Sequence, residues 1–151
     1  MIGAVLLFAA VTVTPQSEIV VATNAPYATR LAAMELNFFL KGIFDCELPI
    51  VGERTGGRSA IALGGGGVKN RDGFVIEATN GVVRIFGNDD DVPGGDVAKT
   101  CWYGAEAPWQ PHFRRGTLFG VYEFLERYAG VRMYFPGELG TIVPRKDKVE
   151  V

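Results

Sequence analysis

Arg115–Arg127, with the sequence RGTLFGVYEFLER, is the stretch that decides the fold. Its apolar residues recur at the period of an amphipathic helix, with charged residues on the opposite face. The face expected to pack on a core carries Leu118, Val121, Tyr122, Leu125 and Ala129. The opposite face carries Glu123, Glu126 and Arg127. Thr117 is expected to cap the start of this helix, Gly120 to allow close packing on a sheet, and Gly130 to end it.

Short runs rich in β-branched residues lie on both sides of this helix and predict strands. A first helix is expected over Ala25–Lys41, capped by Asn24 and ending near Gly42. Asn80-Gly81 joins two alternating runs and predicts a hairpin, because both residues tolerate positive φ. The expected strands are Glu18–Ala22, Ser59–Leu63, Phe74–Ala78, Val82–Phe86 and Val131–Phe135, with a short extended piece at Leu48–Val51. This order predicts an α+β fold, a small mixed β-sheet with two α-helices packed on one face.

Composition narrows the class of protein further. The 151 residues include 15 Lys and Arg against 17 Asp and Glu, a formal net charge of −2. Nucleic-acid and anionic-membrane binders carry a basic excess, so neither partner is expected. Two cysteines and one histidine cannot build a Cys/His metal site, and no cofactor is expected. Whether Cys46 and Cys101 pair stays open at this point.

The N-terminal residues allow two interpretations. Ile2–Val13 is an uncharged apolar run, too short to span a bilayer and of the length of a signal-peptide core. The charged start and a clean cleavage site of a signal peptide are absent, and the β-branched end of the run also suits a buried strand. We therefore expect residues 1–17 to be a signal-peptide remnant or a first strand, and residues 18–151 to form a single domain.

A long segment without periodicity, Asn88–His112, separates the hairpin from the second helix. Loops of this length in compact domains are usually functional or cover a partner. Its rings at Trp102, Tyr103 and Trp109 either stack on sugars, cover the core or dock on a neighbouring domain. The candidate ligand-binding or interface residues are Trp102, Tyr103, Trp109, His112 and Arg115.

The other polar patterns are better explained by structural roles than by binding or catalysis. The acidic cluster Asp89–Asp91 with Asp96 lacks the spacing of an EF-hand and suits a solvated loop better than calcium. His112 with Glu106 or Glu123 is more typical of a structural histidine than of an acid–base pair. Gly64–Gly67 matches neither a dinucleotide nor a phosphate-loop pattern, and indicates a turn. No spacing selects a pair of carboxylates for glycoside hydrolysis.

From about residue 18 to residue 145 the chain resembles a known module. The resemblance is strongest in Arg115–Arg127 and continues through Gly130–Gly137, with the earlier stretches Ala33–Leu36, Glu47–Val51 and Ile61–Gly64 in the same order. These stretches resemble the N-terminal α/β domain that precedes the catalytic barrel in family 67 α-glucuronidases and in related secreted bacterial proteins. That fold is similar to domain 2 of family 20 β-hexosaminidases.

The resemblance implies a non-catalytic accessory domain of a polysaccharide-degrading hydrolase. In that family the catalytic carboxylates lie in the barrel that follows, so no catalytic residue is carried over, and no activity is expected of this chain alone. The expected partner is that C-terminal catalytic barrel, or else a carbohydrate. The resemblance also implies a secreted or periplasmic location. The alternative is a stand-alone carbohydrate-binding module that uses Trp102, Tyr103 and Trp109.

Overall fold

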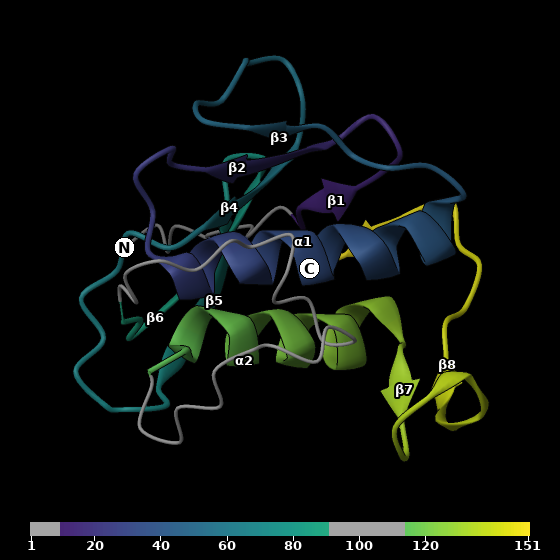
Figure 1. The fold of residues 1–151 in the computed structure, drawn as a ribbon. Coiled ribbons are helices and arrows are strands. Elements are labelled where there is room, and N and C mark those ends of the chain that lie inside the picture. Colours follow the sequence, from purple (N-terminus) through teal and green to yellow (C-terminus); the bar gives the residue numbers. More distant parts are fainter. Residues whose placement is uncertain (1–9, 91–113) are drawn as a thin grey trace, which may run out of the picture.

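A computed structural model describes residues 10–90 and 114–151 of the chain. Its centre is a five-stranded sheet with strand order β3-β2-β4-β6-β5. Both helices lie side by side on one face of this sheet (Figure 1). The sheet strands are β2 (Glu18–Val21), β3 (Ile50–Val51), β4 (Ala60–Leu63), β5 (Phe74–Thr79) and β6 (Val82–Gly87). The expected fold class, a mixed sheet with two helices on one face, is confirmed.

Register places the apolar side chains of the sheet on the helix side. β3, β2, β4 and β6 run parallel, and β5 is an antiparallel edge strand. Ile19, Ile61 and Val83 occupy one cross-strand row and are fully buried. They meet apolar residues of both helices, including Leu36, Leu40 and Leu125, in one continuous core. The strands form because these alternate residues have a helical layer to pack against.

The first helix, α1, spans Tyr27–Phe44 and is longer than expected. It begins after Pro26, whose extended backbone occupies the cap position, so the predicted cap at Asn24 is wrong. The predicted end at Gly42 is also wrong. Gly42 remains helical, and the helix stops at Asp45, which adopts a left-handed φ of 62° and donates its N–H to the Lys41 carbonyl.

The second helix, α2, spans Gly116–Phe124 and continues in a π-helical turn, η1 (Leu125–Ala129), which ends at left-handed Gly130. Leu118, Val121, Leu125 and Ala129 are buried as predicted, Tyr122 of the same predicted face is half-buried, and Phe124, which was not assigned to that face, is fully buried. Gly120 lies against the sheet so closely that an added Cβ would stand 2.6 Å from Ile85 Cγ2. Its predicted role in close packing is therefore confirmed.

The predicted hairpin is present, with β5 and β6 joined at Asn80 and Gly81. Both turn residues have positive φ, 49° and 74°, as a tight turn of the primed type requires. The hairpin places β5 at the edge of the sheet, next to β6.

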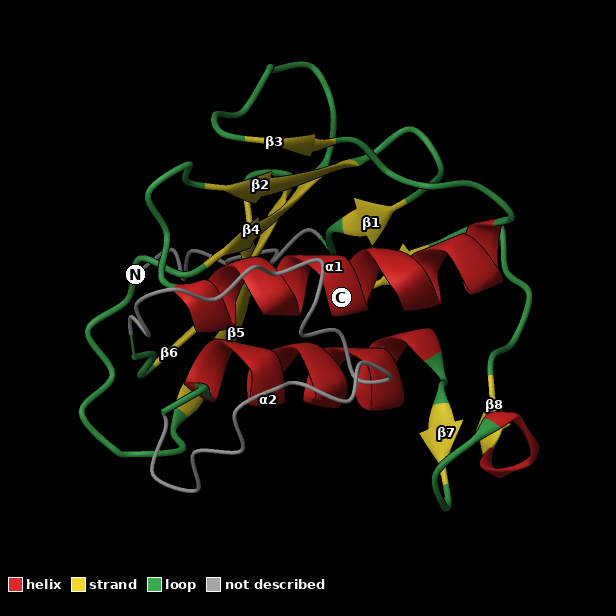
Figure 2. Ribbon diagram, viewed as in Figure 1, coloured by secondary structure: helices red, strands yellow, loops and turns green. Residues whose placement is uncertain are grey.

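The predicted last strand, Val131–Phe135, does not join this sheet. Only β7 (Arg132–Met133) is extended, and it pairs with β8 (Thr141–Ile142) in a separate two-stranded ribbon. The hairpin strand β5 already fills the sheet edge beside β6, and Pro136-Gly137 turns the chain back at once. Val131 is buried, but Met133 and Phe135 are exposed. Figure 2 shows the ribbon beside the 3-10 turn η2 (Glu138–Gly140), beyond the ends of the helices.

The two ends of the described chain pair with each other. β1 (Thr12–Val13) and β9 (Val149–Glu150) form an antiparallel ladder, extended by reciprocal backbone hydrogen bonds of 3.0 Å between Val11 and Val151. Val11, Val13 and Val149 are buried in the core. The end of the apolar run at Ile2–Val13 is therefore a buried strand. No helix among the described residues combines the length and apolarity needed to cross a bilayer.

Candidate functional site

Of the five predicted site residues, Arg115 lies within the described chain. Trp102, Tyr103, Trp109 and His112 fall in residues 91–113, outside the described ranges. Arg115 occupies the cap position of α2, and its guanidinium carbon lies 5.5 Å from the centre of the Phe119 ring. This is a cation–π contact between two half-buried residues in the first turn of the helix. The candidate site is therefore built outward from Arg115.

The two residues that flank segment 91–113 are held together beside Arg115. Asp90 donates its N–H to the Arg114 carbonyl at 2.9 Å, and its carboxylate accepts from the Arg114 N–H at 2.8 Å and from Nε at 2.7 Å. A guanidinium contact of 2.6 Å completes the pair. Hydrogen bonding and charge from Arg114 lower the pKa of Asp90. Asp90 and Arg114, the two residues next to the segment, are thus held together at one point of the fold.

Asp89, the preceding residue, caps α2. Its carboxylate accepts the Thr117 N–H at 2.9 Å and the Thr29 hydroxyl at 2.7 Å, which ties the start of α2 to α1. The predicted cap at Thr117 is wrong, because Thr117 sits inside the helix and its hydroxyl accepts the Gly87 N–H at 3.0 Å. Asp89 and Asp90 are both engaged in these contacts rather than arranged around a metal. No cluster of three or more acidic, histidine or cysteine ligands occurs among residues 10–90 and 114–151.

A tyrosine–carboxyl pair connects the helices next to Arg115. Tyr122 of α2 donates its hydroxyl to Glu35 of α1 at 3.3 Å. Burial raises the pKa of the Glu35 carboxyl, while the hydrogen bond from Tyr122 lowers it. Burial, together with the charge of Glu35, raises the pKa of Tyr122, and Arg115 opposes that shift. Sequence reasoning missed Glu35, although its spacing of four from Leu31 and Phe39 places it at the edge of the buried face.

Chemically this cluster offers one carboxyl group with a raised pKa. Glycoside hydrolysis requires two carboxyl groups that flank a cleft. Glu123, the described acid that sequence analysis had considered beside His112, instead pairs with Arg127 at 3.6 Å. The described part of the site therefore shows a helix–helix contact with a surface arginine, and no paired-acid arrangement.

A second carboxyl group missed by sequence reasoning is Glu18, at the start of β2. Its side chain is buried and accepts the Thr55 N–H at 2.9 Å and the Thr55 hydroxyl at 2.6 Å. The hydrogen bond from the Thr55 side chain lowers the pKa of Glu18, with help from the nearby charges of Arg58 and Arg54. Glu18 thereby fixes the loop between β3 and β4, and its surroundings give it a structural role.

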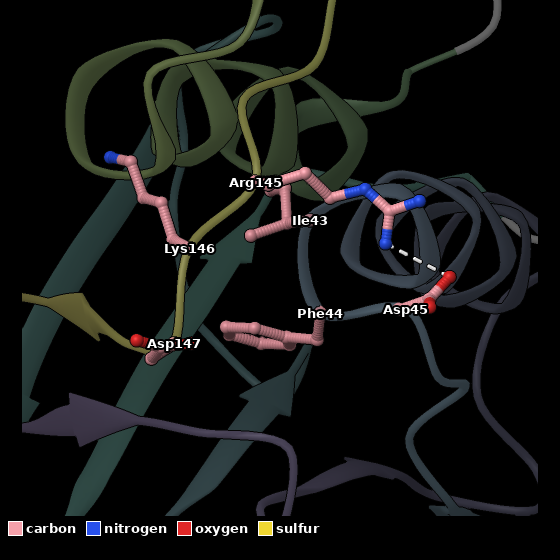
Figure 3. A pocket seen from close by; sticks show the side chains of 6 residues that line it. All are labelled: Ile43, Phe44, Asp45, Arg145, Lys146 and Asp147. Carbon is pink, nitrogen blue, oxygen red and sulfur yellow. Dashed lines mark ion pairs between the residues drawn. The ribbon is translucent and has the colours of Figure 1, made fainter.

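One pocket lies at the opposite end of α1, with a volume of about 270 Å³. Its wall is made by Ile43, Phe44, Asp45, Arg145, Lys146 and Asp147. Figure 3 shows Arg145 reaching Asp45, with which it forms an ion pair of 2.9 Å, while the Lys146 ammonium points away from both aspartates. The pocket is open, and its charged side chains are mostly exposed, so it lacks the enclosed apolar wall of a small-molecule site.

Comparison with known proteins identifies the fold. No protein-family model matches the sequence, and no curated protein is significantly similar to it. Among solved structures, the chain is similar to the GH20 β-N-acetylhexosaminidase from Streptomyces coelicolor A3(2), with a TM-score of 0.55 and 16% sequence identity. The match covers 95% of this chain and 23% of that one. The expected similarity to a region of a family 20 enzyme is thus confirmed at the level of fold.

Proposed function

We propose that this chain is a non-catalytic accessory domain of a carbohydrate-active hydrolase, whose catalytic barrel lies outside these 151 residues. One observation carries the proposal. Almost the whole chain is similar in fold to under a quarter of a glycoside hydrolase, 95% against 23%. A domain of that share leaves room in such a polypeptide for a separate catalytic domain.

The finer assignment is an α-glucuronidase-like enzyme of polysaccharide degradation that acts outside the cytoplasm. Its support is the resemblance of Arg115–Arg127 and Gly130–Gly137 to the domain that precedes the barrel in family 67 enzymes. In the structure these residues form α2, η1 and the start of the β7–β8 ribbon. These residues form part of the buried core and the ribbon, and such structural roles are expected of a non-catalytic domain.

Activity measurements on the purified chain test this proposal. The substrates are aryl glycosides, including N-acetylglucosaminides and glucuronides, and glucuronyl xylo-oligosaccharides. We expect no turnover of any of them. The contrary result is turnover that a single carboxyl change abolishes. Glu35→Gln is the first variant to examine, because Glu35 is the half-buried acid with a raised pKa. Glu123→Gln, at a more exposed acid paired with Arg127, is the matched control.

Sugar binding by loop aromatics is the second candidate, favoured by the position of Arg115. Residues 90 and 114, which flank the segment that carries Trp102, Tyr103 and Trp109 in the sequence, are bonded to each other, and Arg115 directly follows Arg114 and contacts Phe119. A sugar-binding protein should change its tryptophan fluorescence when xylo-oligosaccharides are added, and Trp109→Ala should remove that change without lowering the melting temperature. An unchanged spectrum with every oligosaccharide rules this candidate out.

A further inference from the structure

The β7–β8 ribbon and its connecting turn form an arm, residues 132–142, whose apolar side chains are uncovered. Tyr134 is 70% exposed, Phe135 57% and Leu139 95%, and Met133 and Ile142 are exposed to 44% and 54%. They are among the most exposed large apolar side chains of the described residues, and they follow one another within eleven positions. In Figure 1 the ribbon extends away from both helices.

Apolar side chains stand on both faces of this ribbon. Directly opposite residues of an antiparallel pair share a face. Met133 pairs with Thr141, and Arg132 pairs with Ile142, so Met133 and Ile142 point in opposite directions. The Tyr134 N–H donates to the Gly140 carbonyl at 2.8 Å and continues the ladder, which places Tyr134 on the same face as Ile142. An isolated two-stranded ribbon is marginal in water, and here neither face is packed on a core.

The exposed area matches what a partner needs. A fully exposed large side chain offers about 150–250 Å², so at the exposures given above the five apolar residues expose on the order of 600 Å² in total over the two faces of the ribbon. That value is at the upper end of the largest apolar patches found on monomers, about 300–600 Å². It also approaches the area of about 800 Å² that each side of a standard interface contributes. Charged residues at the margin, Arg132 and Glu138, give the patch a polar rim.

We propose that the 132–142 arm is a docking surface for the catalytic domain of the hydrolase, which grips the ribbon on both faces with a concave apolar surface. This inference rests on the proposed function. A second copy of the chain fits less well, because a contact across a twofold axis covers one face of a ribbon and leaves the other in water. The similar hydrolase chain, of which this fold is 23%, has the additional length that such a partner domain requires.

Oxidation of Met133 by hydrogen peroxide tests the docking. The purified 151-residue chain is compared with the polypeptide of the complete reading frame that contains it, and sulfoxide at Met133 is followed by mass spectrometry. We expect oxidation to be about tenfold slower in the complete polypeptide, because the partner domain covers the thioether. Equal rates overturn the docking, as does a complete reading frame that encodes no further folded domain.

Variants in the complete polypeptide show where the protection comes from. Leu139→Ser and Tyr134→Ser should return the Met133 oxidation rate towards that of the 151-residue chain. The matched control, Phe38→Ser, changes an apolar residue on α1 whose exposure, 63%, is close to that of Tyr134, and should leave the rate unchanged. In the 151-residue chain all three variants should keep the unfolding midpoint, which shows that the fold is intact. If Phe38→Ser removes the protection and the arm variants do not, the partner docks elsewhere and the proposal is wrong.

The remaining outcomes separate this proposal from the proposed function. If Met133 oxidation in the purified 151-residue chain becomes slower as the concentration of that chain rises, a second copy covers the arm. If Met133 of the 151-residue chain is oxidised slowly at every concentration, residues of the same chain cover the arm. Either result overturns the docking. If the complete polypeptide has glycosidase activity but its Met133 is oxidised as fast as in the 151-residue chain, the docking proposal is wrong and the proposed function stands. A protecting domain without glycosidase activity removes the proposed function and leaves the docking in place.

Discussion

Glu18 and Glu35 show how the surroundings of a single carboxyl group decide what its charge does to stability. Glu18 receives two hydrogen bonds from Thr55, and its pKa is lowered. Glu35 receives one long hydrogen bond from Tyr122 and is half-buried, and its pKa is raised. The charged form is therefore favoured by folding at Glu18 and disfavoured at Glu35.

Glu35→Gln should stabilise the protein near neutral pH relative to the original residue. A raised pKa means that the folded state binds more protons than the unfolded state just above the unfolded value of about 4.5. The contribution of Glu35 to stability therefore falls as pH rises through that window, whereas glutamine does not titrate and can still accept the Tyr122 hydroxyl. In urea unfolding at a series of pH values, the free energy of unfolding of the variant should rise relative to that of the original protein between about pH 4 and pH 7.

Glu18→Gln is the control with opposite sign. Because the pKa of Glu18 is lowered in the folded state, its carboxylate stabilises the fold at pH values above the pKa of the unfolded state. This stabilisation is lost as the pH falls through the pKa of the folded state. This variant should be less stable near neutral pH, and the difference should shrink in acid. If both variants changed with pH in the same direction, the surroundings described for one of these carboxyl groups would be wrong.

At the scale of elements, the two faces of the second helix should differ sharply in their tolerance of substitution. Leu125 is fully buried, and Leu125→Ala should cost about 2–5 kcal/mol through lost burial and the cavity that remains. Glu126 is exposed, and Glu126→Ala should stay within about 0.5 kcal/mol. The free energy of unfolding in urea measures both, and similar values for the two variants would contradict the assigned face.

Gly120→Ala tests the close approach of α2 to the sheet. In an open helix this change gains about 1 kcal/mol of helix propensity. Here the new methyl group would lie 2.6 Å from Ile85 Cγ2 and 3.3 Å from Phe74, so we expect a net loss of about 1–3 kcal/mol. Gly67→Ala is the matched control, because no atom lies within 4 Å of the added methyl group there. A stabilised Gly120→Ala variant would show that α2 packs less tightly than described.

Prediction from sequence succeeds for these elements where the signal is local. The Asn80-Gly81 turn and the face of α2 depend on residues within a few positions of one another, and both were predicted correctly. Prediction fails where the local structure depends on a residue that is distant in the sequence. Asp89, not Thr117, caps α2 because the fold brings the end of β6 to the start of that helix. Likewise, Val131–Phe135 has a strand-like pattern, but β5 already occupies the sheet edge beside β6.

The same limit applies to the candidate site. Arg115 was predicted and directly follows Arg114, which bonds Asp90 across the ends of segment 91–113, but Glu35, the partner of Tyr122, was not predicted. Glu35 and Tyr122 are 87 positions apart, and only the packing of α1 on α2 brings them together. The predictions for Trp102, Tyr103, Trp109 and His112 lie outside the described residues and remain predictions.

At the scale of the whole molecule, the β1–β9 ladder joins the two ends of the described chain to the core. Removing Val149–Val151 exposes Val11 and Val13 and deletes the buried Val149 side chain. Burying one valine contributes about 1.5–3 kcal/mol, so we expect a loss of at least about 2 kcal/mol in the free energy of unfolding. Thermal and urea unfolding of the shortened chain measure it. Glu150→Ala keeps the backbone ladder and should have little effect; equal losses would mean that the ladder does not carry the stability.

The pairing of β1 with β9 also affects how the protein folds as it is synthesised. Thr12 and Val13 are synthesised before every other described element, and their partners, Glu150 and Val149, are synthesised after all of them. A contact between such distant parts of a chain forms slowly, because the intervening loop must be closed first. Until β9 has been synthesised, the nascent chain therefore carries an unpaired, β-branched strand, the kind of segment that chaperones bind and that aggregates when it stays exposed.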